Sequence, residues 1–242
     1  MKAINKLLAV LLLLAISTSS AFALMVSNTG MTGGEADGNP VYLAQYAVTV
    51  ENAMDIGASF DVNYDLTWTN IDGASETISA TATYTILDFS GTNLDLGISV
   101  VNNSDPSVSI LSFGMNSDPD PMYVSLLSPG AVFDNVDTNA SFPGGFNPID
   151  ICVYAQNCNG GGFGRGLRSG NSDYLELSLM GEFNGPVTIS DFVMKFQGGL
   201  GSYELPGCIG DDCATTSVPE PAAVALFGLG LLGLAAARRR RT

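Results

Sequence analysis

The chain has 242 residues, of which 24 are acidic, nine are basic and none is histidine, so its formal net charge is −15. The absence of histidine excludes a Ser-His-Asp or Cys-His triad and any histidine-ligated zinc site. So acidic a surface repels nucleic acid and anionic lipid, and we expect no nucleic-acid partner.

The N-terminus has the three parts of a secretory signal peptide. Lys2 and Lys6 give a positively charged start, and a continuous apolar run follows them. Ala21 and Ala23 follow with one residue between them, in the small-x-small arrangement that signal peptidase accepts. We therefore expect residues 1–23 to direct export and to be removed by cleavage after Ala23.

The charge is unevenly distributed along the chain. Six of the nine basic residues lie in the two terminal segments, whereas every acidic residue lies between Glu35 and Glu220. The predicted mature body, residues 24–217, therefore carries 23 acidic and three basic residues, a net charge of −20. We interpret this charge as a means of keeping an exported protein soluble; attraction of divalent cations or basic partners is the alternative.

Residues 24–206 follow the pattern of a single all-β domain. Nine segments are rich in β-branched and aromatic residues, and clusters of Gly, Pro, Asn and Asp that favour turns separate them. The predicted strands are 41–52, 58–70, 75–90, 94–102, 108–116, 122–127, 150–155, 173–183 and 187–197. We predict an antiparallel β-sandwich of the jelly-roll or immunoglobulin-like type.

Three of these segments alternate between apolar and polar residues, which predicts one buried side and one wet side. The predicted buried sides hold Phe60, Val62, Tyr64, Leu66 and Trp68 in the second segment, Ile78, Ala80, Ala82, Tyr84 and Ile86 in the third, and Leu175, Leu177 and Leu179 in the eighth. In the eighth segment, Glu176, Ser178 and Met180 take the opposite side.

The four cysteines form two close pairs in the sequence, Cys152 with Cys158 and Cys208 with Cys213. Because an exported chain matures in an oxidising compartment, we expect disulfides, and two local loops are the simplest of the three possible connectivities. Each short loop would stabilise the fold by about 2 kcal/mol. The spacings do not fit a zinc site.

Acidic residues near turns are weak candidates for calcium ligands, because calcium prefers carboxylate oxygens. Asp118 and Asp120 lie in the stretch NSDPDP, and Asp211 and Asp212 lie next to Cys213. Asp beside Pro is also common in turns without any metal. We therefore expect no cofactor.

Aromatic residues are the candidates for carbohydrate binding. Exposed aromatics on a sheet would serve this purpose, and Trp68, Tyr42, Tyr46 and Tyr123 are the residues in question. Alternating aromatics in strands more often belong to the core, so we expect most of them to be buried.

After a polar tether, residues 207–217, the chain ends in an apolar run and a basic cluster. The run, residues 222–237, would be a helix of about 24 Å, somewhat shorter than the roughly 30 Å hydrocarbon core. The four arginines that follow keep the C-terminus in the cytoplasm; they are Arg238, Arg239, Arg240 and Arg241. The sequence thus predicts one transmembrane helix in the inner membrane, with the body outside.

The residues before this run complete a recognisable pattern. Val218, Pro219, Glu220 and Pro221, then the apolar run, then the arginines, resemble the PEP-CTERM sorting signal of Gram-negative bacteria over residues 218–242. The resemblance implies recognition by an exosortase, a membrane transpeptidase. It further implies removal of the tail and transfer of the body to the cell surface or extracellular matrix.

The body is also similar to the cistern family of PEP-CTERM proteins. The similarity lies in three stretches, Ser112–Pro121, Phe142–Leu179 and Phe192–Gln197. Cys152 and Cys158 are the paired cysteines of that pattern. This resemblance implies no particular activity.

The sequence favours a non-enzymatic protein of the cell surface or matrix, associated with exopolysaccharide in a biofilm or floc. A carbohydrate-binding module, with or without calcium, is the alternative. A glycoside hydrolase is a third option because two carboxylates are enough for that chemistry. With 23 carboxylates in the body, however, such pairs arise easily by chance.

Overall fold

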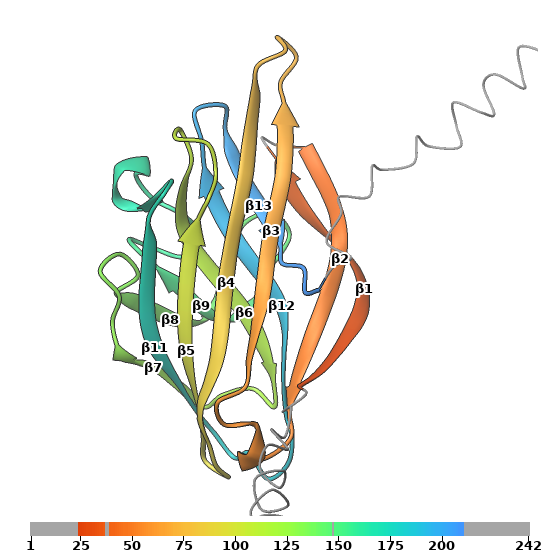
Figure 1. Ribbon diagram of the computed structural model, residues 1–242, viewed down its shortest axis with the longest axis vertical. Coiled ribbons are helices and arrows are strands. Elements are labelled where there is room, and N and C mark those ends of the chain that lie inside the picture. The colour runs from red at the N-terminus through yellow and green to blue at the C-terminus, as the bar shows by residue number, and fades with distance from the viewer. Residues whose placement is uncertain (1–23, 37–38, 147, 211–242) are drawn as a thin grey trace, which may run out of the picture.

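The computed structural model describes residues 24–36, 39–146 and 148–210. The predicted signal peptide, Cys213 and the sorting tail lie outside these ranges. The described part of the chain is almost entirely β, with two antiparallel sheets and two short 3-10 helices, η1 (Ala53–Asp55) and η2 (Phe163–Arg165) (Figure 1). None of the helices in these ranges has the length and apolar character needed to cross a membrane. The predicted span, residues 222–237, lies outside them.

The larger sheet, called sheet A, contains eight strands. They are β1 (Met25–Ala36), β2 (Asn39–Val50), β6 (Ser109–Asp118), β8 (Asn135–Ala140), β9 (Ile149–Tyr154), β10 (Leu167–Arg168), β12 (Val187–Gln197) and β13 (Ser202–Pro206). Their order is β13-β1-β2-β12-β6-β9-β8, with β10 paired to β6. Because β13 also pairs with β12, strands β12, β2, β1 and β13 form a closed circuit of hydrogen-bonded neighbours.

The smaller sheet, called sheet B, contains five strands. They are β3 (Ser59–Thr69), β4 (Ser75–Phe89), β5 (Asn93–Asn102), β7 (Tyr123–Ser128) and β11 (Ser172–Met180), in the order β3-β4-β5-β11-β7. The chain crosses repeatedly from one sheet to the other, so each sheet mixes early and late strands (Figure 1). This confirms an all-β architecture of two antiparallel sheets; the jelly-roll or immunoglobulin-like assignment stays a prediction.

All nine predicted strands are present, as β2 to β7, β9, β11 and β12. The structure adds β1, β8, β10 and β13. Strands β1 and β8 are rich in Gly, Asn, Asp and Thr, and β10 has only two residues, so their sequences carry little intrinsic signal for a strand. Pairing with neighbouring strands, rather than local propensity, makes these segments extended.

The main core lies between the sheets and follows the predicted alternation. All five residues predicted for the buried side of β4, and all three for β11, are at most 1% exposed. Tyr84 stacks on Phe60 with ring centroids 5.1 Å apart and meets Phe192 of sheet A at 5.4 Å. Leu66 and Trp68, near the end of β3, are only partly buried but still pack against this core.

The edges of the two sheets approach each other on both sides. A groove of about 420 Å³ separates β7 of sheet B from β8 of sheet A. On the opposite side, Asn63 in β3 exchanges two backbone hydrogen bonds with Cys208, of 2.7 and 2.8 Å. A Cβ on Gly207 would lie 2.2 Å from Val62 Cγ1, so the chain can pass this close only as glycine. Ile209 is 8% exposed, so the first residues of the predicted tether pack against the body.

Candidate functional site

The outer face of sheet A is covered by a second apolar cluster. Its members are Ala140, Phe142, Phe146, Ile149, Cys152, Cys158 and Val193. Cys152 and Val193 alternate along their strands with residues of the main core, so they point to the opposite side of the sheet. The loops that follow β8 and β9 supply the rest of the cover.

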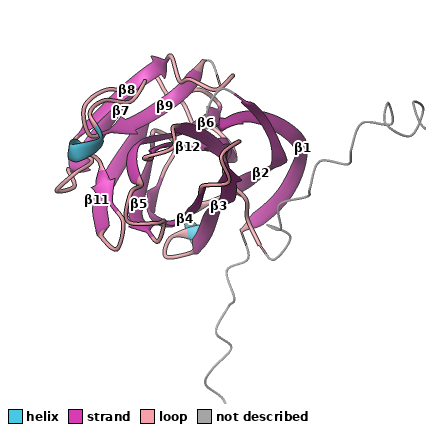
Figure 2. Ribbon diagram, turned by 90° about the horizontal axis from the view of Figure 1, so that it is seen from above, coloured by secondary structure: helices cyan, strands magenta, loops and turns pink. Residues whose placement is uncertain are grey.

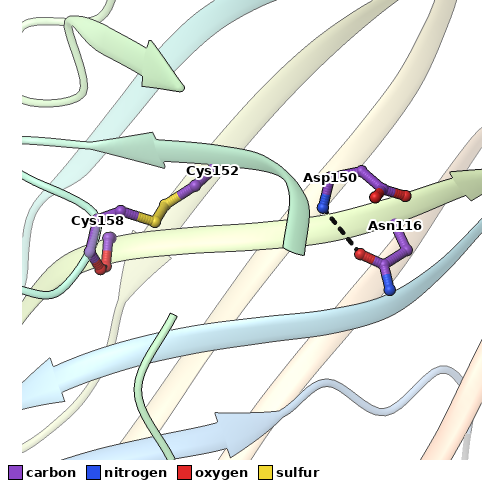
Figure 3. The surroundings of a disulfide bond; sticks show 5 residues. Asn116, Asp150, Cys152 and Cys158 are labelled. Atoms are coloured by element: carbon purple, nitrogen blue, oxygen red, sulfur yellow. Dashed lines mark hydrogen bonds between the residues drawn. A yellow bond between two sulfur atoms is a disulfide. The ribbon is translucent and has the colours of Figure 1, made fainter. Parts of the chain in front are cut away.

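A disulfide fixes the second of these loops. Cys152 in β9 is bonded to Cys158, with a Cα–Cα distance of 6.0 Å, which confirms the predicted pair (Figure 3). The hydroxyl of Ser112 in β6 donates to the carbonyl of Cys158 at 2.9 Å and ties the loop to the sheet. Cys208 is also disulfide-bonded, and Cys213, with which we predicted it to pair, lies outside the described residues.

A buried ion pair lies beneath the same cover. Lys195 in β12 stands opposite Glu204 in β13, and its ammonium donates to the Glu204 carboxylate and, at 2.7 Å, to the Ser202 hydroxyl. Lys195 is 7% exposed and Glu204 is 2% exposed. A Cβ on Gly144 would lie 2.5 Å from Glu204 Cβ, and one on Gly160 would lie 2.5 Å from Lys195 Cε. The loops close over the pair only because both residues are glycine, so the pair is sealed from any large ligand.

The three stretches from which the resemblance to the cistern family was predicted lie together at this face. Strand β6, from the first stretch, pairs with β9 of the second and with β12 of the third. Gly144 and Gly160, both in the second stretch, cover Lys195 and Glu204. The stretches therefore form one packed unit that stabilises the fold.

The calcium candidates Asp118 and Asp120 lie where β6 ends. Asp118 is exposed and its backbone pairs with Thr188, which places it at the rim of sheet A. The ranges that the structure describes contain no group of three or more acidic or cysteine side chains placed to hold a metal ion. The structure thus offers no support for calcium at these two residues, and Asp211 and Asp212 lie outside the described ranges.

Two further carboxylates near this rim have neutral hydrogen-bond partners. Asp191 accepts hydrogen bonds from Gln45 and, at 2.8 Å, from Asn116. The side-chain oxygen of the same asparagine, Asn116 Oδ1, accepts a hydrogen bond of 3.0 Å from the backbone N–H of Asp150 (Figure 3). Partial burial raises the pKa of Asp150, a hydrogen bond from the Ser117 backbone opposes this, and the nearby negative charges raise the pKa further. The arrangement ties β6, β9 and β12 together.

Of the predicted carbohydrate-binding aromatics whose side chains the structure describes, one is well exposed. Tyr46 is 6% exposed and belongs to the main core. Trp68 packs partly against that core, and its buried indole N–H has no hydrogen-bond partner among the described residues. Tyr123 in β7 is 59% exposed. The side chain of Tyr42 lies outside the description.

The outer face of sheet B contrasts with that of sheet A because no apolar cluster of the described residues covers it. Its central strands present hydroxyl and carboxylate groups that are exposed or half-exposed. Thr83 donates to Asp61 at 2.6 Å, and Ser178 donates to Asp95 at 2.5 Å. Neighbouring strands thus share hydrogen bonds across the face while their carboxylates remain at the surface.

One aromatic residue that the sequence analysis missed lies on this face. Tyr174 in β11 is half exposed, and its hydroxyl donates to Glu176 at 3.1 Å. A Cβ on Gly97 would lie 2.9 Å from Tyr174 Oη and 3.4 Å from Leu87 Cδ1, so the tyrosine lies across β5 and beside Leu87. Desolvation, followed by the hydrogen bond and charge of Glu176, raises the pKa of Tyr174 and keeps the phenol protonated as a donor. The sequence did contain a signal for this exposure, because Tyr174 lies two residues before Glu176 and therefore on the predicted wet side of the strand.

The comparisons with known proteins bear on the C-terminal tail. Residues 217–241 match the PEP-CTERM protein-sorting motif. The match confirms the predicted sorting signal, within which Pro219, Glu220 and Pro221 lie, and it implies that the chain is exported and processed by an exosortase through a membrane-anchored intermediate. No curated protein and no solved structure matches the chain. The match does not extend to the body, so the resemblance to the cistern family stays a prediction.

Proposed function

We propose that this protein is a non-enzymatic component of the cell surface or extracellular matrix, where it has a structural or adhesive role beside exopolysaccharide. The observation that carries the proposal is the PEP-CTERM sorting motif at residues 217–241. In this scheme Arg238 to Arg241 hold the tail in the cytoplasm while the exported body waits outside the inner membrane. Exosortase then recognises Pro219-Glu220-Pro221 and releases the body.

The body has features suited to life outside the cell. A disulfide holds a loop onto sheet A, and disulfides persist in oxidising compartments. Its net charge of −20 favours solubility after release. Neither feature carries chemistry, which is why we assign no enzymatic role.

Carbohydrate binding by the body is the second candidate function. The observation that favours it is the pair of exposed tyrosines on sheet B, Tyr174 and Tyr123. Aromatic side chains with one apolar face and one polar tip are suited to contact with partly polar ligands. This function is compatible with the first, since a matrix protein would hold polysaccharide.

The sorting step is tested by replacing Pro219, Glu220 and Pro221 with alanine. We expect export to continue but the variant to accumulate in the inner membrane with its tail intact, because the two prolines keep the recognition segment extended. A matched control replaces Thr215, Thr216 and Ser217 with alanine and is expected to reach the surface normally. Mass spectrometry of surface and membrane fractions measures both outcomes. Surface-localised wild-type protein that retains LLGLAAARRRRT, or normal delivery of the first variant, would contradict the proposal.

A further inference from the structure

We propose that the outer face of sheet B binds a polysaccharide that carries free amino groups, with Tyr174 as the platform under a sugar ring and Glu176, Asp95 and Asp61 as the groups that meet the amines. This assignment deepens the proposed function and rests on it. It names the class of polymer and the face of the body that takes it.

The charge of the face indicates a cationic occupant. Five carboxylates of sheet B lie on its outer side: Asp61, Asp65, Asp88, Asp95 and Glu176. Four of them alternate with core residues along their strands, and Asp88 pairs with Asp95. The five strands contain no lysine or arginine. Within the described ranges the one salt bridge is that of Lys195 with Glu204, in sheet A. Hydroxyl or amide groups donate hydrogen bonds to Asp61, Asp88, Asp95 and Glu176, and none of the five carboxylates has a counter-charge among the described residues.

The spacing of these carboxylates fits a polymer better than a single ion. Glu176 stands opposite Gly97, and Asp95 lies two residues away along β5, so the Cα atoms of Glu176 and Asp95 are about 8 Å apart. Asp61 lies two strands away from β5 and further along the sheet, roughly 16 Å from Asp95. Asp88 and Asp95 stand opposite each other, but the other carboxylates are spread over the surface, whereas a divalent cation needs several ligands around one point. A chain with an amine on successive sugar rings can meet several of them at once.

The position of Tyr174 supports a sugar ring as the repeating unit. Because its hydroxyl reaches across Gly97, the ring lies along the sheet instead of standing away from it, and half of its area stays exposed. Leu87, itself 37% exposed, extends the same apolar platform. The electron-rich face of a tyrosine attracts the C–H groups of a pyranose and, more strongly, an ammonium group. An extended peptide would instead be expected to add to a sheet edge through its backbone.

The test uses the processed wild-type protein recovered from the surface fraction and three soluble probes. They are a hexamer of β-1,4-linked glucosamine, the same hexamer fully N-acetylated, and hexalysine. We expect calorimetry to detect binding of the glucosamine hexamer, with an affinity that decreases as salt is added. The acetylated hexamer, which has the same rings without charge, should bind at least tenfold more weakly. Hexalysine, which has charge without rings, should also bind at least tenfold more weakly.

Four variants separate a site from general attraction to an acidic protein. Tyr174→Ala should weaken binding of the glucosamine hexamer at least tenfold, and Tyr174→Phe should retain most of it because the ring remains. Gly97→Ala keeps the tyrosine but pushes it off the sheet, and it should weaken binding to a similar extent as Tyr174→Ala. Asp72→Asn removes one exposed charge in the turn between β3 and β4, away from the face, and should change the affinity by less than twofold.

The outcomes distinguish this inference from the proposed function. Equal binding of hexalysine, or unchanged affinity in both Gly97→Ala and Tyr174→Ala, overturns the inference and leaves only non-specific charge attraction. Absence of binding by a protein that is delivered normally to the surface overturns the inference alone. Failure of the wild-type protein to reach the surface in the sorting experiment overturns the proposed function, whatever the purified protein binds. Melting temperatures within a few degrees of wild type establish that each variant is folded.

Discussion

The outer faces of the two sheets are built from the same kind of antiparallel strand, yet they differ in whether loops of the described residues cover them. On sheet A the loops after β8 and β9 fold back over the strands and enclose a second apolar cluster, a disulfide and an ion pair. On sheet B no loop of the described residues folds over the corresponding side, which carries hydroxyls and carboxylates. Figure 2, in which the molecule is seen from above, shows the strands of the two sheets arranged around the shared core.

The difference between these faces suggests that one sheet contributes mainly to stability and the other to recognition. A covered face fixes its polar groups in one arrangement, because a buried charge without a partner is costly. An open face loses little when one of its groups is changed, so its composition is free to serve binding. We therefore expect substitutions on sheet A to affect stability strongly and substitutions on sheet B to affect it weakly.

The largest effect is expected from Lys195→Met. This change leaves the carboxylate of Glu204 buried without its counter-charge and should reduce the free energy of unfolding by about 3–5 kcal/mol. Urea denaturation of the processed protein measures the loss. The control is Lys195→Met combined with Glu204→Leu, which removes both charges and should recover most of the stability. If the single variant were as stable as wild type, the covered face would not contribute to stability in the way that its buried ion pair suggests.

A smaller effect is expected from opening the disulfide on the same face. Replacing Cys152 and Cys158 together with serine should lower the free energy of unfolding by about 2 kcal/mol, because the loop that the bond closes is short. The wild-type exported protein should contain no free thiol, as determined by thiol titration after unfolding. Recovery of two free thiols at positions 152 and 158 would contradict this prediction.

The smallest effect is expected on the open face. Thr83→Ala removes an exposed hydrogen bond to Asp61 in the middle of sheet B and should change the free energy of unfolding by no more than about 0.5 kcal/mol. The same denaturation experiment measures it beside the Lys195 variants. A loss comparable with that of Lys195→Met would mean that sheet B is as tightly constrained as sheet A, and the contrast between the faces would fail.

Local sequence patterns were sufficient to predict many of the strands, one disulfide and the sorting signal of the protein. The alternation in residues 75–90 predicted both the strand β4 and its buried side, because side-chain direction along a strand repeats every two residues. The pair Cys152 and Cys158 followed from close spacing in an exported chain. The sorting motif likewise depends on a fixed order of residues near the C-terminus, which needs no tertiary structure.

The residues of the candidate site were harder to predict from the sequence. Tyr123, Tyr46 and Trp68 were chosen because they are aromatic, yet only Tyr123 is well exposed among them. Tyr174 could have been found from its place on the wet side of β11, but its orientation depends on Gly97, which lies far away in the sequence and becomes its neighbour only when β5 pairs with β11.

What the sequence by itself determined about this protein is therefore local: nine of its strands, the buried sides of β4 and β11, one disulfide and the C-terminal sorting signal. Only the tertiary structure decided that β1, β8 and β13 are strands, that Lys195 meets Glu204 under Gly144 and Gly160, and that one sheet face is covered while the other is open. The physical reason is that periodicity and spacing act between residues close in the chain. The register between strands, and the path of the loops over them, depend on contacts between residues that are distant in the sequence.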